Sequence, residues 1–139
     1  MSQANRGMQL EKSVEELFLH YEQRGIFCLK IEVKEVNGIR IKKSPFDFIV
    51  HYNKIMYGFD AKNCQNGNIG IANFKLHQIK ALTDVSDQGG VGFFLVYFAD
   101  IKQLELIPVE EIARLKAKGL KAIAPDVKRK VPLDFLQIL

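Results

Sequence analysis

The sequence has few of the features that cross-link a protein, anchor it in a membrane or direct its export. Its 139 residues include only two cysteines, Cys28 and Cys64, which fit neither a CxxC redox pair nor a four-ligand zinc set. No apolar run approaches the roughly 18 residues that a membrane-spanning helix needs. The polar N-terminal segment shows no signal peptide. These absences predict reduced thiols in a cytoplasmic protein that has no membrane partner.

The sequence motifs of several enzyme classes are also missing. There is no GxxxxGK[ST] or GxGxxG loop, so we expect no nucleotide cofactor. There is no GxSxG nucleophile, and the spacing of the histidines does not suggest zinc. The chain is 47% hydrophobic and 26% charged, an ordinary globular balance. It therefore predicts one domain over residues 1–139.

Basic residues are concentrated in two parts of the chain. Residues 114–130 hold seven lysines and arginines and one acidic residue, although the whole chain has a net charge of only +4. A second basic cluster lies within residues 30–43. Such clusters neutralise the phosphates of a nucleic acid, but a solvated face without a polyanionic partner explains the charge alone equally well. The segment 114–139 is therefore a candidate nucleic-acid contact.

Apolar periodicity predicts an α/β fold. Helices are expected at residues 8–24, 72–85 and 108–118. Half-buried or fully buried strands are expected at residues 27–33, 45–51, 55–62, 91–98 and 103–107. Asn37-Gly38 predicts a hairpin turn with a short return strand at 39–41. The order α-β-β-β-α-β-β-α predicts a central mixed sheet flanked by helices. Residues 1–6 are expected to be frayed, and the tail after Gly119 gives no clear pattern.

Asp47, Asp60 and Lys62 are the residues with the clearest chemical potential. Asp60 and Lys62 point to one face because side chains alternate along a strand, and a short hairpin places Asp47 beside them. Two carboxylates and one ammonium group fit a magnesium site, in which the lysine orients or deprotonates the attacking water. The competing explanation is a surface Asp–Lys salt bridge. The apolar neighbours predict inner strands, where unpaired carboxylates are costly, and this favours the metal site.

Two helical residues are candidates for the same site. Glu11 lies near the edge of the apolar stripe of the first helix and is a possible third acidic ligand, directly or through water. It is equally well explained as an outward acid in the first helical turn. Gln78 lies on the apolar face of the second helix, where a buried amide needs partners that an active site can supply. An ordinary polar residue at a helix edge is an equally good explanation.

These residues resemble the motifs of a known family. Glu11, the PFD at 45–47, the DAK at 60–62 and Gln78 resemble the PD-(D/E)xK nuclease superfamily, which has a restriction-endonuclease-like fold. Residues 5–11, NRGMQLE, resemble the RGMxLE opening of the RecU-type Holliday junction resolvases. Residues 73–78, NFKLHQ, resemble their NFxxHQ helix, and residues 92–96, GFFLV, their following apolar strand.

The resemblance implies a homodimeric, magnesium-dependent endonuclease that resolves four-way DNA junctions by paired nicks in recombination and repair. Manganese is the expected substitute for magnesium, and the host is expected to be bacterial, or the protein phage-encoded. By resemblance, Glu11, Asp47 and Asp60 would bind the metal, Lys62 would position or activate the water, and Gln78 would support the site or contact DNA. The expected DNA contacts are Arg6, Arg40, Lys42, Lys43, Lys75, Lys128, Arg129 and Lys130.

Two departures from the family pattern leave other functions open. Asp60 stands where the resolvases usually have glutamate, and only residues 34–44 are available where the bacterial proteins carry a longer stalk. One alternative is a general PD-(D/E)xK nuclease that acts on duplex DNA or on ends. The other is a non-catalytic nucleic-acid-binding module whose acidic residues are structural.

Overall fold

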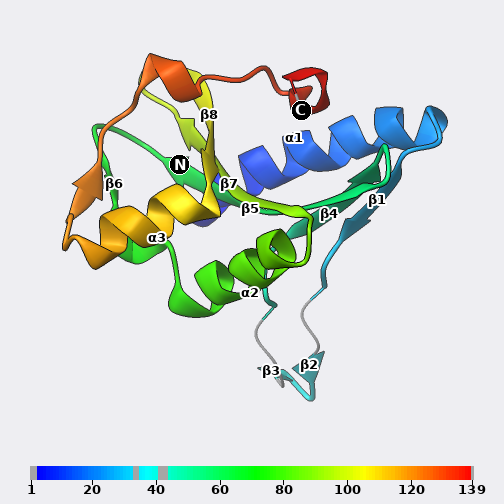
Figure 1. Cartoon of the computed structure of the whole chain (residues 1–139), viewed down its shortest axis with the longest axis horizontal. Coiled ribbons are helices and arrows are strands. Elements are labelled where there is room, and N and C mark those ends of the chain that lie inside the picture. Colours follow the sequence, from blue (N-terminus) through cyan, green and yellow to red (C-terminus); the bar gives the residue numbers. More distant parts are fainter. Residues whose placement is uncertain (1–2, 33–34, 41–43, 139) are drawn as a thin grey trace.

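The protein is built on a five-stranded mixed sheet (Figure 1). The computed structural model describes residues 3–32, 35–40 and 44–138. The strand order is β1-β4-β5-β7-β8, in which only β5 and β7 are parallel neighbours. The strands are β1 (Phe27–Lys30), β4 (Phe48–Tyr52), β5 (Ile55–Cys64), β7 (Val91–Phe98) and β8 (Gln103–Pro108).

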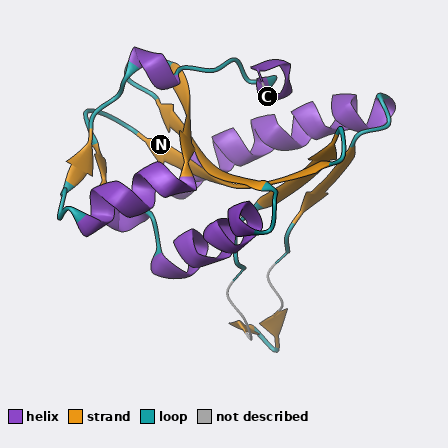
Figure 2. Ribbon diagram, viewed as in Figure 1, coloured by secondary structure: helices purple, strands orange, loops and turns teal. Residues whose placement is uncertain are grey.

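Helices cover both faces of this sheet (Figure 2). Helix α1 (Gln3–Gln23) packs on one face, and α2 (Leu76–Asp87) and α3 (Val109–Ala117) pack on the other. Two short strands, β2 (Glu35–Val36) and β3 (Ile39–Arg40), form a ribbon that projects from the body. Two others, β6 (Ile69–Gly70) and β9 (Ala122–Ile123), pair with each other. The 3₁₀ turns are η1 (Ile71–Asn73), η2 (Val127–Arg129) and η3 (Phe135–Ile138). No described helix is long and apolar enough to span a membrane.

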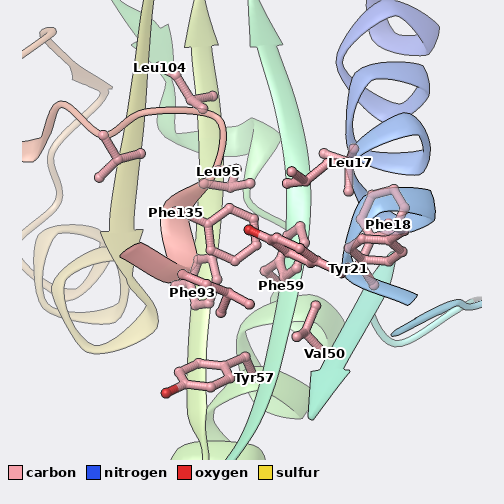
Figure 3. Packing of buried hydrophobic residues seen from close by; sticks show 14 of the residues in the cluster. Leu17, Phe18, Tyr21, Val50, Tyr57, Phe59, Phe93, Leu95, Leu104 and Phe135 are labelled. Carbon is pink, nitrogen blue, oxygen red and sulfur yellow. The ribbon is translucent and has the colours of Figure 1, made fainter. Parts of the chain in front are cut away.

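An aromatic stack holds the sheet together on the face that α1 covers (Figure 3). The rings of Phe48, Phe59 and Phe93 come from three adjacent strands, with centroids 5.2 and 5.0 Å apart along the row. Phe135, from η3, packs edge-on against Phe59 at 5.1 Å. Because side chains alternate along β5, this packing turns Asp60 towards the opposite face.

The C-terminal tail completes this core. Val131 N–H donates to the carbonyl of Leu104, which places the tail beside β8. Phe135 is fully buried, and the hydroxyl of Tyr21 donates to Asp134 at 2.6 Å, which ties the tail to α1. The tail, which has no clear periodicity, is therefore part of the packed domain as far as residue 138.

The structure confirms the expected order of the main elements and the mixed sheet. Several boundaries were predicted wrongly: the strand expected at 45–51 begins at Phe48, and two helices begin elsewhere than expected. The first helix already begins at Gln3, so residues 3–6 are helical and not frayed. The second begins at Leu76 and not at 72, because residues 71–73 form a 3₁₀ turn and Lys75 has the extended backbone of a helix N-cap.

In the first strand, which was expected to run to residue 33, the large apolar side chains lie on the exposed face. β1 ends at Lys30, and Phe27 and Leu29 are 59% and 47% exposed, whereas Cys28 packs against the core beneath α1. β1 is an edge strand that extends beyond the part of the sheet that α2 covers (Figure 1). The alternation therefore predicts the strand but not which of its faces is buried.

Candidate active site

The register of one hairpin brings Asp47 and Asp60 together. A two-residue turn at Asn53 and Lys54, both with left-handed backbone (φ 52° and 69°), joins β4 to β5 and sets Phe48 opposite Phe59. Asp47 N–H continues the ladder to the carbonyl of Phe59, and the Asp47 carboxylate accepts a hydrogen bond of 3.0 Å from Ala61 N–H. The expected proximity is confirmed, while the catalytic roles of these residues stay a prediction.

The two carboxyl groups share a buried environment. Burial raises the pKa of Asp47, and the negative charge of Asp60 raises it further. Burial also raises the pKa of Asp60, which is only 2% exposed, although the neighbouring Lys62 opposes the shift. Since two buried carboxylates in contact are costly when both are charged, the pair favours one shared proton or a bound cation.

Lys62 links this pair to α2. Its Nζ lies 2.8 Å from Asp60 Oδ2 and donates to Gln78 Oε1 at 2.9 Å. The same Gln78 oxygen accepts a hydrogen bond from the backbone N–H of Lys75, which satisfies a free donor at the start of the helix. Gln78 therefore fixes the ammonium group of Lys62 while it caps α2.

Glu11, on α1, interacts electrostatically with Asp47 and forms an ion pair with a lysine. Lys30 Nζ lies 3.7 Å from Glu11 Oε2 and 3.1 Å from Glu15 Oε1. Burial raises the pKa of Glu11, the charge of Asp47 raises it further, and Lys30 lowers it. Among the described residues, no three histidine, cysteine or acidic side chains are grouped closely enough to hold a metal. The structure thus brings Glu11 into the electrostatic field of Asp47 but not into one ligand cluster with both aspartates.

Two carboxylates and a buried, unsatisfied oxygen fit a hard divalent cation. Asp60 Oδ1 is buried and receives no hydrogen bond from any described donor. A buried oxygen of this kind normally has a partner. Carboxylate oxygens are the ligands that magnesium prefers, usually one or two of them with water and phosphate completing the shell. Asp47 and Asp60 would therefore hold the ion, and Glu11 would act on Asp47 through its charge.

Sequence reasoning missed the role of Lys30 at this site. It counted Lys30 only as part of a basic cluster. In the sheet, Lys30 lies opposite Phe48, the residue after Asp47, so β1 carries its ammonium group to the Glu11 side of the site. The pattern of charged residues did contain a signal, because Glu11 and Glu15 are one turn apart on α1 and together offer two carboxylates to one cation.

The structure places the expected DNA contacts in different surroundings. Lys75, Lys128 and Lys130 are exposed, and Lys75 begins the helix that carries Gln78. Lys42 and Lys43 lie outside the described residues. Arg6 and Arg40 belong to α1 and β3, but their side chains are outside the described part of the chain.

Arg129 is held inside the protein. Its guanidinium donates to Glu105 at 3.0 Å, to Glu111 at 2.9 Å and to the carbonyl of Ala124 at 2.7 Å. Glu105 is fully buried and also accepts a hydrogen bond from the N–H of Asp126. The structure therefore uses Arg129 to anchor the tail, and this arrangement leaves little of its guanidinium for a phosphate.

The fold and the position of the acidic pair define the class of the protein. A mixed sheet flanked by helices, with the acidic pair where two central strands meet, is a restriction-endonuclease-like fold. A solved structure with this fold, described as Hjc, a Holliday junction resolvase from the archaeon Archaeoglobus fulgidus, covers 88% of this chain and 89% of its own, with a TM-score of 0.53 and 13% sequence identity.

Sequence comparison identifies the family. Residues 5–131 match the Recombination protein U (RecU) family, and the chain belongs to it. A relative named Holliday junction resolvase RecU, from Mycoplasmopsis pulmonis, is 30% identical over 98% of this chain and 94% of its own length. A relative with the same name from Streptococcus gordonii is 27% identical over 96% of this chain and 72% of its own.

Proposed function

We propose that this protein resolves four-way DNA junctions as a divalent-metal-dependent endonuclease in recombination and repair. Membership of the RecU family supports the substrate class. The observation that carries the chemistry is the pair of buried carboxyl groups, Asp47 and Asp60, that the β4–β5 register places opposite each other, together with an Asp60 oxygen that no described donor satisfies. Magnesium is the expected ion, with manganese as its substitute.

The chemistry divides between the ion and the side chains around it. A cation bound by Asp47 and Asp60 would polarise the scissile phosphate and lower the pKa of a bound water. Lys62 is held by Asp60 and Gln78 at hydrogen-bond distance, so its ammonium group is positioned before substrate arrives. From there it orients the attacking water and stabilises the negative charge that develops on the phosphate. The products are a 5′-phosphate and a 3′-hydroxyl.

Paired nicks require two such sites, and we therefore propose a homodimer. A chain of this size carries one acidic pair, so two opposed strands are cut together only if two copies act on one junction. The same proposal places the protein in the cytoplasm, where the free Cys28 and Cys64 remain reduced.

The first test is cleavage of a labelled four-way junction beside a matched linear duplex, with magnesium, manganese or EDTA. We expect symmetric nicks in the junction alone, and only with metal. Asp60→Asn and Lys62→Ala are expected to remove cleavage while junction binding in EDTA changes little. A matched control is Asp87→Asn, an exposed acid at the end of α2.

Three results would contradict this proposal in different ways. Cleavage of both substrates would identify a general nuclease, and tight binding without cleavage in either metal would identify a binding module. Equal loss of binding and cleavage in Lys62→Ala would contradict the role given to that lysine. As a readout that does not depend on activity, magnesium or manganese should raise the melting temperature of the wild type but not that of Asp60→Asn, since a ligand of the folded state stabilises it.

A further inference from the structure

A basic groove lies on the other side of α1 from the candidate active site. Its volume is about 670 Å³, and it runs between α1, the turn from β7 to β8, and the tail beside β8. Its apolar lining comes from both the sheet and the tail, while lysines and other polar side chains surround this lining. The lining residues are Gln9, Leu10, Lys12, Ser13, Glu16, Tyr97, Lys102, Leu104, Lys130, Val131 and Leu133.

The charge of the groove is positive. Lys12, Lys102 and Lys130 line it with one acidic residue, Glu16. All three lysines are exposed, and within the described parts of the chain none of them forms an ion pair. Lys30, Lys62 and Lys80 are paired with acids, whereas Lys54 and Lys121, exposed elsewhere, form no ion pair among the described residues either, so the feature of the groove is that three such lysines lie together. Three unpaired ammonium groups around one groove match an anionic ligand with several charges.

The groove and the active site use opposite flanks of one helix. Glu11 faces β1, where Lys30 holds it, whereas Ser13, two residues further and about 200° around the helix, lines the groove. The groove and Glu11 therefore lie on opposite sides of α1.

The tail holds the backbone of one of the three lysines in place. Arg129 is fixed by Glu105 and Glu111, and Val131 N–H donates to the carbonyl of Leu104. Lys130 lies between these two anchors, and its backbone bridges to Glu105.

From this arrangement we propose that the groove binds the phosphodiester backbone of a second DNA strand, one that is not being cut at the adjacent active site. The lysines contact the phosphates, and Tyr97, half-buried in β7, offers an aromatic surface to a sugar or an unstacked base. This proposal rests on the proposed junction-cleaving function and adds a second strand contact to it. It requires no sequence preference, because phosphate contacts position DNA without reading it.

The test removes the three groove charges and measures the salt dependence of junction binding in EDTA. The variant Lys12→Gln/Lys102→Gln/Lys130→Gln is compared with Arg24→Gln/Lys54→Gln/Lys80→Gln, which loses the same net charge elsewhere on the surface. Each phosphate contact contributes about 0.9 to the slope of log K against log salt, so the loss of three lysines from each subunit of the proposed dimer should lower this slope by about 5. The control variant should leave the slope near that of the wild type.

A second measurement locates the DNA, and it uses the lack of tryptophan in the chain. Tyr97→Trp would supply the only tryptophan, and its fluorescence should change when a junction binds. Phe27→Trp, at the exposed far edge of the sheet, serves as the matched control and should not respond.

The outcomes separate this proposal from the proposed function. If the wild type neither binds nor cuts junctions, the proposed function fails. If it does both while the groove variant keeps the wild-type slope and Tyr97→Trp stays silent, only the groove proposal is overturned. Sedimentation that shows a lost dimer in the groove variant would also overturn it, because the groove would then be a contact between subunits. A smaller slope with an intact dimer and a responding Tyr97→Trp supports it.

Discussion

Asp60 combines a satisfied and an unsatisfied oxygen on one buried carboxylate. Oδ2 is paired with Lys62 at 2.8 Å, and Oδ1 is buried without a described donor. The carboxyl of Asp47 adds a second negative charge to the same place, so each aspartate raises the cost of ionising its neighbour. A protein without catalytic need for this pair gains more stability from neutral side chains there. We therefore infer that the aspartate pair lowers the stability of the metal-free protein and serves to bind a metal.

The raised pKa of Asp47 predicts how stability depends on pH in the absence of metal. The folded protein binds a proton at Asp47 more tightly than the unfolded chain, whose aspartates titrate near pH 3.9 (about the model-peptide value). Between the pKa of Asp47 in the unfolded chain and its higher pKa in the folded protein, the native state binds more protons than the unfolded state. The free energy of unfolding therefore falls as pH rises towards neutral. Below the lower value this dependence disappears.

Asp47→Asn should remove that dependence. The amide keeps an acceptor for Ala61 N–H and has no charge to oppose Asp60. In EDTA at pH 8 we expect the variant to be more stable than the wild type by up to about 4 kcal/mol, since burial and Asp60 raise the pKa of Asp47 to about 7 and each unit of pKa shift corresponds to about 1.4 kcal/mol. The gain should shrink at pH 5. Urea unfolding at both pH values measures it, and a wild-type stability that rises between them would contradict the assignment.

At the level of elements, the β4–β5 hairpin positions both aspartates. Its turn holds two consecutive residues in the left-handed region, the geometry that matches the twist of paired strands. Asn53 tolerates this conformation well, but Lys54, with φ 69°, adopts it at a steric cost. The register that places Asp47 opposite Asp60 is thus fixed by a turn with one unfavourable residue.

Lys54→Gly should therefore stabilise the protein. Glycine has no Cβ to clash in the left-handed region, and we expect a gain of about 1 kcal/mol, the cost of that conformation less the extra entropy of glycine in the unfolded chain. Thermal unfolding checks it. The same change at Lys80, inside α2, should instead destabilise by about 1 kcal/mol, as glycine does in helices. A loss of stability in Lys54→Gly would mean that the lysine side chain contributes contacts that outweigh the strain.

The sequence predicts these elements correctly where the structure depends only on residues close together in the chain. The strand periods and the proximity of Asp47 to Asp60 follow from alternation and from hairpin length, both local properties. The start of α2 did not follow, because buried Phe74 extends the helical pattern through residues that form a 3₁₀ turn. The buried face of β1 did not follow either, since it depends on which part of the sheet α2 covers.

Residue roles were least predictable where they depend on partners far along the chain. Lys30 and Arg129 both lie in basic clusters, yet one holds Glu11 and the other neutralises Glu105, which is 24 residues away. Composition shows the charge of such residues but not its partner. Lys130, next to Arg129, is exposed, whereas the guanidinium of Arg129 is paired inside the protein.

Across the whole molecule, the tail connects α1, β8 and α3. Tyr21 binds it through Asp134, Glu105 and Glu111 bind it through Arg129, and Phe135 fills the space over the aromatic stack. Both the core and the basic groove therefore depend on residues 126–136. We therefore expect Arg129 to affect DNA binding only by fixing the position of the tail.

Arg129→Met tests that view. It leaves Glu105 charged, buried and without its counter-ion, for which we expect a loss of about 3–5 kcal/mol in the free energy of unfolding. Adding Glu105→Met should recover part of that loss, because the pair is then replaced by apolar side chains, although the N–H of Asp126 loses its acceptor. Urea unfolding of the wild type, the single variant and the double variant gives both values.

An Arg129 that contacts DNA directly would behave in the opposite way. The single variant would then keep its stability, lose junction affinity, and gain nothing from the second substitution. In the arrangement observed here, the double variant should regain stability and junction affinity together, because restoring the tail restores Lys130 to the groove. A double variant that regains stability while its junction affinity stays low would show that the guanidinium itself is needed by the DNA.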